Sequence, residues 1–452
     1  MPALSLLAAS LTLVLATAVQ AAQIGVIPPA EPLTPARIAA LPQAQRAGWA
    51  DYLARSDAQR NADRAALAAE RQGLAQLSPP PASGNGPASM PLDKPADWYA
   101  GDAARAVARN ILSFQTPAGG WGKNQPRDAA PRQPGQAWVA DGNPKAPTPG
   151  DFDKPGNWSY VGTIDNEATT WEIRFLARMA AAHEGEAGAA YRQAAERGLR
   201  YLLAAQYPNG GWPQVWPLQG GYHDAKSRTF ARSAAQVWPL QGGYHDAITL
   251  NDNAMVDVME LLGTASRGEA GFGFLPDALR AELAAAEARA VQLLLAMQVR
   301  IDGQPTLWGQ QHDVLTLAPT SARNYEPPAL SSGESARALA YLMSLPQPSP
   351  EVVAAVRGGI AMLKRLAVHD RAWVMVDAQQ GKRLVEQPGA GPLWSRYYDP
   401  VTLKPVFGDR DKTLHDDVHD ISAERRRGYA WWGSWPLKTI QAYDGWIARQ
   451  GG

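Results

Sequence analysis

Apolar residues recur along most of this chain at the three- and four-residue spacing of amphipathic α-helices. Seven such runs follow one another, at residues 102–115, 169–182, 191–206, 253–263, 277–298, 334–345 and 349–368. An Ala-rich, charged stretch at residues 33–76 predicts one or two further helices. Between residues 372 and 411, short alternating runs punctuated by Gly and Pro predict strands. The pattern therefore predicts a mainly α-helical protein with a small β-containing C-terminal part.

A longer pattern occurs three times along the helical region. Each copy is an apolar run that ends in Gln, then a loop with Gly and Trp, then a polar helix start. The three Gln residues advance by 91 and then 92 positions, and each is followed by a Trp: Gln115 and Trp121, Gln206 and Trp212, Gln298 and Trp308. Such a period is typical of helical units that are stacked or arranged in a circle. We therefore expect three loops and three helix starts on one rim.

The ends of these regions predict the domain organisation. An apolar stretch at residues 4–18, followed by small residues, predicts a signal peptide at 1–22 and hence secretion, and it is short for a membrane span. The Pro- and Ser-rich residues 78–91 indicate a linker. We therefore divide the chain into the signal peptide, an N-terminal helical segment with its linker at 23–92, and a main domain at 93–452.

One segment departs from this regular organisation. Within residues 214–247, the twelve residues QVWPLQGGYHDA occur twice, at 214–225 and 236–247. Structural repeats normally diverge, so complete identity indicates a recent partial duplication or a sequence artefact. Because surface loops tolerate long insertions, we expect the extra copy to loop out at the surface.

Composition excludes several classes of function. Lys and Arg together number 43, as do Asp and Glu, so the formal net charge is zero. This balance argues against bulk attraction to nucleic acid or to a membrane surface. The chain has no Cys, which excludes disulfides, thiolate catalysis and Cys-ligated metals.

Side chains with oxygen atoms cluster at two of the helix starts, at residues 165–167 and 251–253. The ordinary role of Asp and Asn at such positions is to cap the helix. Because the clusters occupy equivalent positions in two repeats, Asp165 and Asp252 also suggest ligands for a hard cation such as Ca²⁺. Trp121 and Trp212 follow Gly-Gly, where we expect aromatic faces for sugar stacking, with core packing as the alternative.

Arginines in loops supply the remaining chemistry. Arg323, Arg396 and Arg410 lie in the last third of the chain, where the run at 425–427 adds three more. They could form ion pairs with nearby acids, but planar guanidinium groups also match carboxylates. Together with the tryptophans they suggest a carboxylated sugar polymer. Three histidines could act as bases or, more ordinarily, only form hydrogen bonds: His312, His415 and His419.

Taken in order, these motifs resemble those of family 10 pectate lyases. The resemblance runs from about Asp93 to the C-terminus and rests on GGWGKN, TIDNEATTWEI, YPNGGWPQ, GYHDAITLNDNAM, PTSARNYEPPALSSGES, WSRYYDP, FGDRD and ISAERRRGYAWWG. It implies an (α/α) toroid of the (α/α)₃ type. It also implies a secreted monomer that cleaves α-1,4-polygalacturonate of pectin by Ca²⁺-dependent β-elimination, with neither nucleic acid nor membrane as a partner.

The resemblance also implies roles for individual residues. Arg323 matches the position of the Brønsted base, which conflicts with the rule that Arg stays protonated in proteins. Arg396 and Arg410 match groups that bind substrate carboxylates, and Asp165 and Asp252 match the metal site. The matching motifs also suggest four further substrate-binding residues: Trp121, Trp212, Lys123 and Asn166. The duplication departs from the family pattern because it separates NGGWPQ from NDNAM.

Two other functions remain open from the residues alone. A glycoside hydrolase on the same toroid would need two facing carboxylates, for which Asp165 and Asp252 are candidates. A non-catalytic pectin-binding protein would keep the same surface without turnover.

Overall fold

The structure is a computed structural model that describes residues 23–79, 81–82, 84, 86–139, 161–219 and 243–450. The predicted signal peptide and the middle of the duplicated region lie outside the described residues. Within the described part of the chain, no helix has both the length and the apolar character that crossing a membrane requires.

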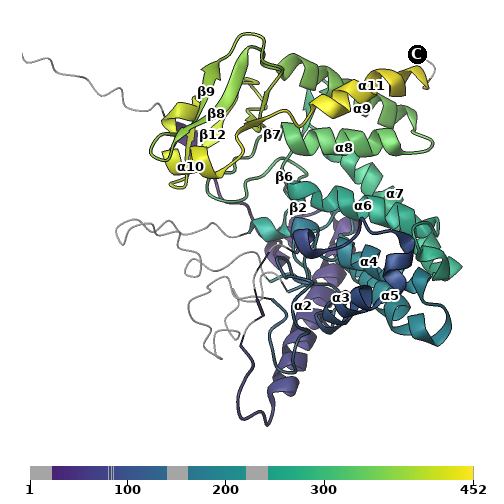
Figure 1. The fold of residues 1–452 in the computed structure, drawn as a ribbon. Coiled ribbons are helices and arrows are strands. Elements are labelled where there is room, and N and C mark those ends of the chain that lie inside the picture. Colours follow the sequence, from purple (N-terminus) through teal and green to yellow (C-terminus); the bar gives the residue numbers. More distant parts are fainter. Residues whose placement is uncertain are drawn as a thin grey trace, which may run out of the picture.

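Helices dominate the fold, and all seven predicted runs form helices (Figure 1). Three helical hairpins follow one another, α4 with α5, α6 with α7 and α8 with α9. Helices α4, α6 and α8 are neighbours in one row, and α3, α5, α7 and α9 are neighbours in a second row. The bounds are α3 Asp102–Ser113, α4 Thr170–Ala182, α5 Ala189–Ala205, α6 Ala254–Ser266, α7 Asp277–Met297, α8 Ser332–Ser344 and α9 Pro350–Leu366.

The repeated Gln residues join these two rows to the loops. In each copy the side-chain amide Nε2 donates one hydrogen bond to a carbonyl of its own loop and another to the next helix of the second row. The second acceptors are Ala194 of α5 for Gln115 at 2.9 Å, Ala286 of α7 for Gln206 at 2.9 Å, and Ala355 of α9 for Gln298 at 3.0 Å. The sequence period therefore reflects a repeated connection between neighbouring hairpins.

The repeated Trp residues are core residues. Their indole Nε1 atoms donate to a carbonyl of the preceding helix at 2.7–2.8 Å, and the same bond from Trp394 to Leu363 of α9 adds a fourth copy: Trp121, Trp212, Trp308 and Trp394. All four are at most 1% exposed. The prediction that Trp121 and Trp212 present faces to a sugar is therefore wrong. The preceding Gly-Gly explains why, since a Cβ on Gly120 would lie 2.7 Å from the Tyr201 ring and the loop packs tightly against α5.

Strands are short, antiparallel and concentrated in the C-terminal part, as predicted. The longest pair is the hairpin of β8 (Arg371–Asp377) and β9 (Gly381–Glu386). Three-stranded sheets join β1 (Gln23–Val26), β13 (Thr413–His415) and β12 (Phe407–Gly408), and also β11 (Tyr397–Tyr398), β7 (Leu330–Ser331) and β5 (Trp308–Gly309). The remaining pairs are β10 (Trp394–Ser395) with β14 (Trp432–Gly433), β2 (Ile248–Thr249) with β6 (Gln311–His312), and β3 (Arg300–Ile301) with β4 (Gln304–Pro305). The short helix α10 (Ala423–Gly428) packs against β9, and α11 (Leu437–Ala448) packs against α8.

The N-terminal segment forms α1 (Pro35–Ala39) and α2 (Gln43–Arg71), as its pattern predicts. Trp49 and Tyr52 of α2 belong to the same hydrophobic core as the helical rows. Strand β1 also pairs with β13 near the opposite end of the chain. Residues 23–72 thus pack directly on the main domain, while the division at residue 92 stays a prediction.

The duplicated region contributes one set of packed residues to the described structure. Trp216 and Leu218 come from the first copy and Tyr244 from the second, and all three are buried. The described residues 214–219 come from the first copy and 243–247 from the second, and together they connect the second loop to β2.

Candidate functional site

Two distorted helix starts hold the predicted acidic residues. Residues 165–167 form a short turn before α4, and residues 251–253 form its counterpart before α6. Asn166 and Asp252 both adopt left-handed backbone, with φ of 51° and 49°, a conformation that Asn and Asp tolerate better than most residues. The caps of α4 and α6 are Thr169 and Asn253, and neither makes a side-chain capping bond. Capping is therefore not the role of Asp165 or Asp252.

Asp165 is paired with a lysine of the first loop. Its buried carboxylate forms an ion pair with Lys123. Burial alone would raise the pKa of Asp165, but attraction to Lys123 outweighs it and holds the pKa below its usual range. Asn166 donates a hydrogen bond to Asn124 at 3.0 Å. The structure thus brings together Lys123, Asp165 and Asn166, three of the predicted site residues.

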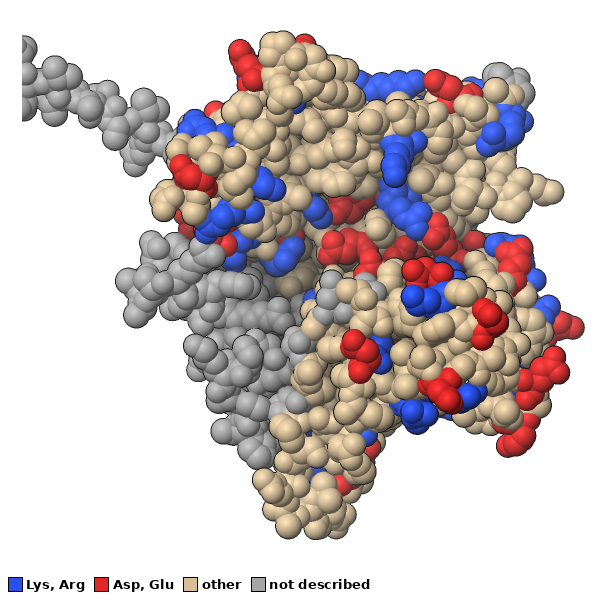
Figure 2. All heavy atoms as spheres, viewed as in Figure 1, with Lys and Arg blue, Asp and Glu red and all other residues tan. Residues whose placement is uncertain are grey.

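Acidic groups crowd around Asp252 and Glu167. Burial, followed by repulsion from Asp257 and Asp252, raises the pKa of Glu167 to about 7. Loss of hydration in the groove and repulsion from Asp165 also raise the pKa of Asp252, although its side chain keeps an exposed surface. Figure 2 shows acidic side chains gathered along the groove between α8 and α6. A bound cation would relieve this repulsion, so the oxygen donors present fit a hard divalent ion.

The donors of the described residues do not by themselves complete a metal site. Among the described residues, no group of three His, Cys, Asp or Glu side chains is placed to hold a metal ion. A cation at Asp165 and Asp252 would therefore take most of its ligands from substrate and water, the arrangement typical of a cation that binds together with an anionic substrate.

Arg323 is tied to a carboxylate three residues further along the chain. Its Nε and backbone N–H donate to Glu326 Oε2 at 2.8 and 2.9 Å, and its Nη2 contacts the other oxygen. Burial alone would lower the pKa of Arg323, but attraction to Glu326 outweighs it and raises the pKa above its usual range. The same pairing lowers the pKa of Glu326 to about 2, despite its burial. Without substrate, Arg323 is thus held in its protonated form.

The other predicted arginines also have carboxylate partners. Arg396 contacts Glu334 at 2.6 Å, and Arg410 contacts Glu424 at 2.9 Å. Arg323 and Arg396 both lie over the ring of Tyr429, with the guanidinium carbon 5.7 and 4.9 Å from its centroid. The structure therefore gathers Arg323 and Arg396 around one aromatic side chain.

A polar network that sequence reasoning missed joins the acidic and basic groups. Gln310 donates to Asn251 and, at 3.4 Å, to Glu326. The hydroxyl of Tyr429 donates to Glu326 at 2.7 Å and lies 2.7 Å from that of Tyr397. Glu326 and Tyr429 stand inside the motifs NYEPP and RRGYAWW, which could have pointed to them. Gln310 has no comparable signal.

The histidines form hydrogen bonds. His312 is completely buried, and its ring accepts from the Gly309 N–H at 2.9 Å and contacts the Leu317 carbonyl at 2.7 Å. Burial lowers the pKa of His312 to about 4, so this ring is neutral near pH 7. His415 contacts Thr413 Oγ1 at 2.8 Å, and His419 contacts Asp417 at 2.8 Å. For His312 the hydrogen-bonding alternative is confirmed.

Three charged groups of the site, two acidic and one basic, line one cavity. Asp252, Glu334 and Arg396 line a cavity of about 410 Å³ between α6, α8 and α11. The model of one protein family, Pec_lyase (pectic acid lyase), matches residues 115–234 and 229–440, and the two matches overlap within the duplicated region. The chain belongs to the pectic acid lyase family. This confirms the resemblance of its motifs, and the hydrolase alternative is wrong.

Solved structures agree with this membership. The lyase is similar to a family 10 polysaccharide lyase from Cellvibrio cellulosa and to a mutant of that enzyme in complex with trigalacturonic acid. Each comparison has 28% sequence identity and a TM-score of 0.61, and covers 79% of this chain and 98% of the solved chain. Among curated proteins, none matches the chain. The protein is therefore a polysaccharide lyase with a mainly α-helical fold.

Proposed function

We propose that this lyase is a secreted, monomeric enzyme that cleaves α-1,4-polygalacturonate by Ca²⁺-dependent β-elimination. The observation that carries the proposal is the shared cavity, where Asp252 faces the cationic Arg396. The similar enzyme in complex with trigalacturonic acid supports the substrate class. Secretion rests on the predicted signal peptide, and the two helical rows support an (α/α)₃ toroid.

β-Elimination removes the C5 proton, which is α to the uronate carboxylate, forms a C4=C5 double bond and breaks the C4–O4 bond. The leaving O4 oxygen takes up a proton from solvent. Neutralising that carboxylate lowers the pKa of the C5–H group and stabilises the enolate-like charge that follows. We assign this role to Arg396 and Arg410, whose guanidinium groups match a carboxylate. Ca²⁺, held by Asp165 and Asp252, would supply further positive charge at the carboxylate. Asn166, and Lys123 that pairs with Asp165, would orient the sugar.

Arg323 is the proposed Brønsted base. It must be neutral to accept the C5 proton, and its pairing with Glu326 opposes this. The base role therefore requires the Arg323–Glu326 pair to open when substrate binds. It also requires the proton of Arg323 to leave before the C5 proton is transferred. Since only a small fraction of Arg323 is neutral near pH 7, activity should rise steeply with pH in the alkaline range.

The first prediction concerns Arg323. We expect Arg323→Ala to lower kcat by about 10²–10⁴-fold, the usual contribution of a general base, while trigalacturonate still binds in calorimetry. In the wild type, kcat should rise about tenfold per pH unit between pH 7 and 9, because the neutral form of a group with so high a pKa grows in that proportion. Ultraviolet absorbance of the unsaturated product measures turnover, and a chelator should abolish it.

Arg300→Ala is the matched control, because Arg300 is an exposed arginine on β3 whose side chain, among the described residues, donates only to the Gly303 carbonyl. It should leave kcat unchanged. If Arg323→Ala keeps more than half of the wild-type kcat, Arg323 is not the base. If the wild type releases reducing ends without ultraviolet absorbance, or binds polygalacturonate without turning it over, the lyase proposal fails.

A further inference from the structure

Trp435 borders the proposed catalytic cavity without belonging to the core. It lies between β14 and α11, lines the cavity of about 410 Å³, and is 37% exposed. The four tryptophans of the repeat are at most 1% exposed. A large aromatic side chain that stays partly open to solvent beside a cavity is typical of a binding surface.

The indole of Trp435 packs closely against two glycines. A Cβ on Gly433 would lie 2.5 Å from the Cε2 and Cζ2 atoms of Trp435, so a larger residue there would displace the ring. On Gly333, the second residue of α8, a Cβ would lie 3.7 Å from the Cγ and Cδ2 atoms. The indole thus lies against the backbone of two elements, next to Glu334, the partner of Arg396.

The cavity also offers a cation beside this indole. Lys438, in the first turn of α11, is exposed and lines the same space. It has no ion-pair partner in the part of the chain that the structure describes. Arg337 lines the cavity as well, but its guanidinium contacts Asp257 at 3.1 Å and Glu260 at 2.7 Å. Among the described basic residues that line the cavity, Lys438 is therefore the one without a carboxylate partner, whereas Arg396 pairs with Glu334.

We propose that Trp435 and Lys438 bind a uronate unit of the polymer that is not itself at the cleaved bond. The indole would stack on the apolar face of the sugar ring, and the Lys438 ammonium would pair with its carboxylate. This inference rests on the proposed function and extends it to a binding position on the α8–α11 side of the cavity. Trp435 is a substrate-binding residue here and takes no part in the bond changes.

The test compares substrate lengths. With oligogalacturonates of increasing length, kcat/KM of the wild type should step up at the length that first reaches Trp435. Trp435→Ala should remove this step, lowering kcat/KM on polygalacturonate about tenfold through KM, with kcat within about twofold. The shortest cleaved oligomer should be unaffected. Trp435→Phe, which keeps an aromatic face, should retain most of the step, and Lys438→Gln should lose about three- to fivefold.

Lys364→Gln is the matched charge control, since Lys364 lies on α9, outside the cavity lining, and pairs with Asp444. Calorimetric binding of the same oligomers runs in parallel. If the wild type binds the oligomers but forms no unsaturated product, the proposed function fails. The inference about Trp435 is then still tested, because the binding series does not depend on turnover. The inference is overturned if Trp435→Ala and Lys438→Gln keep the wild-type length dependence of affinity, or if both weaken every length equally. If Trp435→Ala does not fold, Trp435→Phe and Lys438→Gln carry the test.

Discussion

At the scale of single residues, the buried carboxylate of Asp63 makes the stability of this lyase depend on pH. Asp63 lies on α2, is 1% exposed and accepts a hydrogen bond from Gln59 Nε2 at 2.8 Å. Burial raises its pKa to about 6. The unfolded chain loses this proton near pH 4, whereas the folded protein keeps it until about pH 6. Stability contributed by Asp63 is therefore complete below pH 4 and is lost as pH rises from 4 to 6.

The prediction is that Asp63→Asn removes this pH dependence. The shift of about two pKa units corresponds to at most about 3 kcal/mol of unfolding free energy. At pH 7.5 the variant should therefore be more stable than the wild type, and at pH 4 the two should be equal. Urea unfolding at both pH values measures this, with Asp51→Asn on the exposed face of α2 as the control. Equal stability at pH 7.5 would show that Asp63 is solvated in the native state.

Residue types of the site could be predicted from the sequence, but their partners could not. Asp165, Asp252 and Arg323 stand out as acids and a base in polar loops. The pairing of Arg323 with Glu326 depends on a turn that brings positions three apart into contact. The burial of Trp121 depends on the tight packing of Gly120 against Tyr201. Both are properties of packing, which a linear pattern does not encode.

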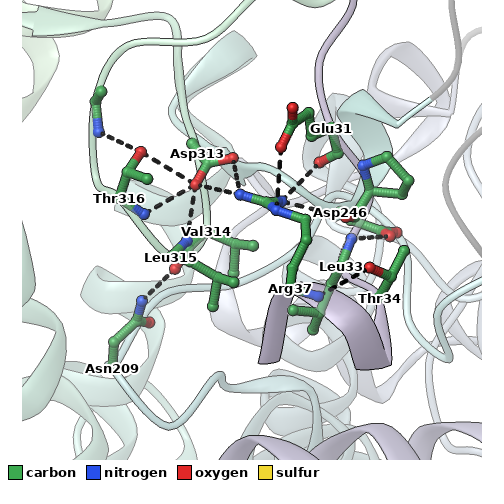
Figure 3. A network of polar contacts seen from close by, with 12 residues as sticks. Glu31, Leu33, Thr34, Arg37, Asn209, Asp246, Asp313, Val314, Leu315 and Thr316 are labelled. Carbon is green, nitrogen blue, oxygen red and sulfur yellow. Dashed lines mark hydrogen bonds and ion pairs between the residues drawn. The ribbon is translucent and has the colours of Figure 1, made fainter. Parts of the chain in front are cut away.

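At the scale of elements, α1 connects the N-terminal segment to two of the repeat loops (Figure 3). The guanidinium of Arg37 donates to both oxygens of Asp313 at 2.9 and 2.7 Å. Nearby, the N–H of Leu33 donates to Asp246 at 3.0 Å. Asn209 donates to the carbonyl of Val314 at 2.8 Å, which ties the second loop to the same place. Helix α1 thus fixes the loops that precede the two later helix starts.

We predict that Arg37→Ala lowers the unfolding free energy by about 1.5–3 kcal/mol, the usual range for hydrogen bonds between charged groups. Asp313 would keep its backbone N–H partners but lose the guanidinium. Thermal or urea unfolding gives the measurement. Arg267→Ala serves as the control, because its pair with Glu269 is exposed and should contribute less than about 1 kcal/mol. An unchanged midpoint for Arg37→Ala would mean that α1 does not stabilise these loops.

Elements with a strong local period were predictable, and those created by distant partners were not. All seven apolar runs became helices because their spacing places one face toward a shared core. Most strands are two residues long and exist only because a distant segment lies beside them, as β2 does beside β6. The fourth Trp of the repeat could not be predicted from the sequence period. Trp394 lies 31 positions after its acceptor Leu363, whereas Trp121 lies only 10 positions after its acceptor Ile111.

At the scale of the whole molecule, the duplication lets either of the two identical segments supply the packed residues between the second loop and β2. Because the copies are identical, removing any 22 consecutive residues within 214–247 yields the same shorter sequence. The flanks are fixed, since Trp212 is buried before the region and β2 pairs with β6 directly after it. The packed residues can therefore start from the first copy and finish from the second, which is what the described ranges 214–219 and 243–247 show.

The last prediction follows from this arrangement. Deleting residues 220–241 should leave the packed residues Trp216, Leu218 and Tyr244 in place, so kcat should stay within about twofold of the full chain. Shortening the chain between the fixed residues 219 and 243 should also raise the unfolding free energy by about 1–2 kcal/mol, through the smaller entropy of closing a shorter connection. Product absorbance and urea unfolding of both chains measure the two effects.

Two point variants of the full chain sharpen this test. Trp216 is 4% exposed and contacts the ring of Tyr201, so Trp216→Ala should cost about 3–5 kcal/mol, as truncation of a buried aromatic usually does. Trp238→Ala, the same change in the second copy, should cost much less, since Trp216 fills that place in the core. A larger loss from Trp238→Ala than from Trp216→Ala would mean that the second copy supplies this packed tryptophan. An inactive deletion chain would mean that the 22 residues contribute to the active fold.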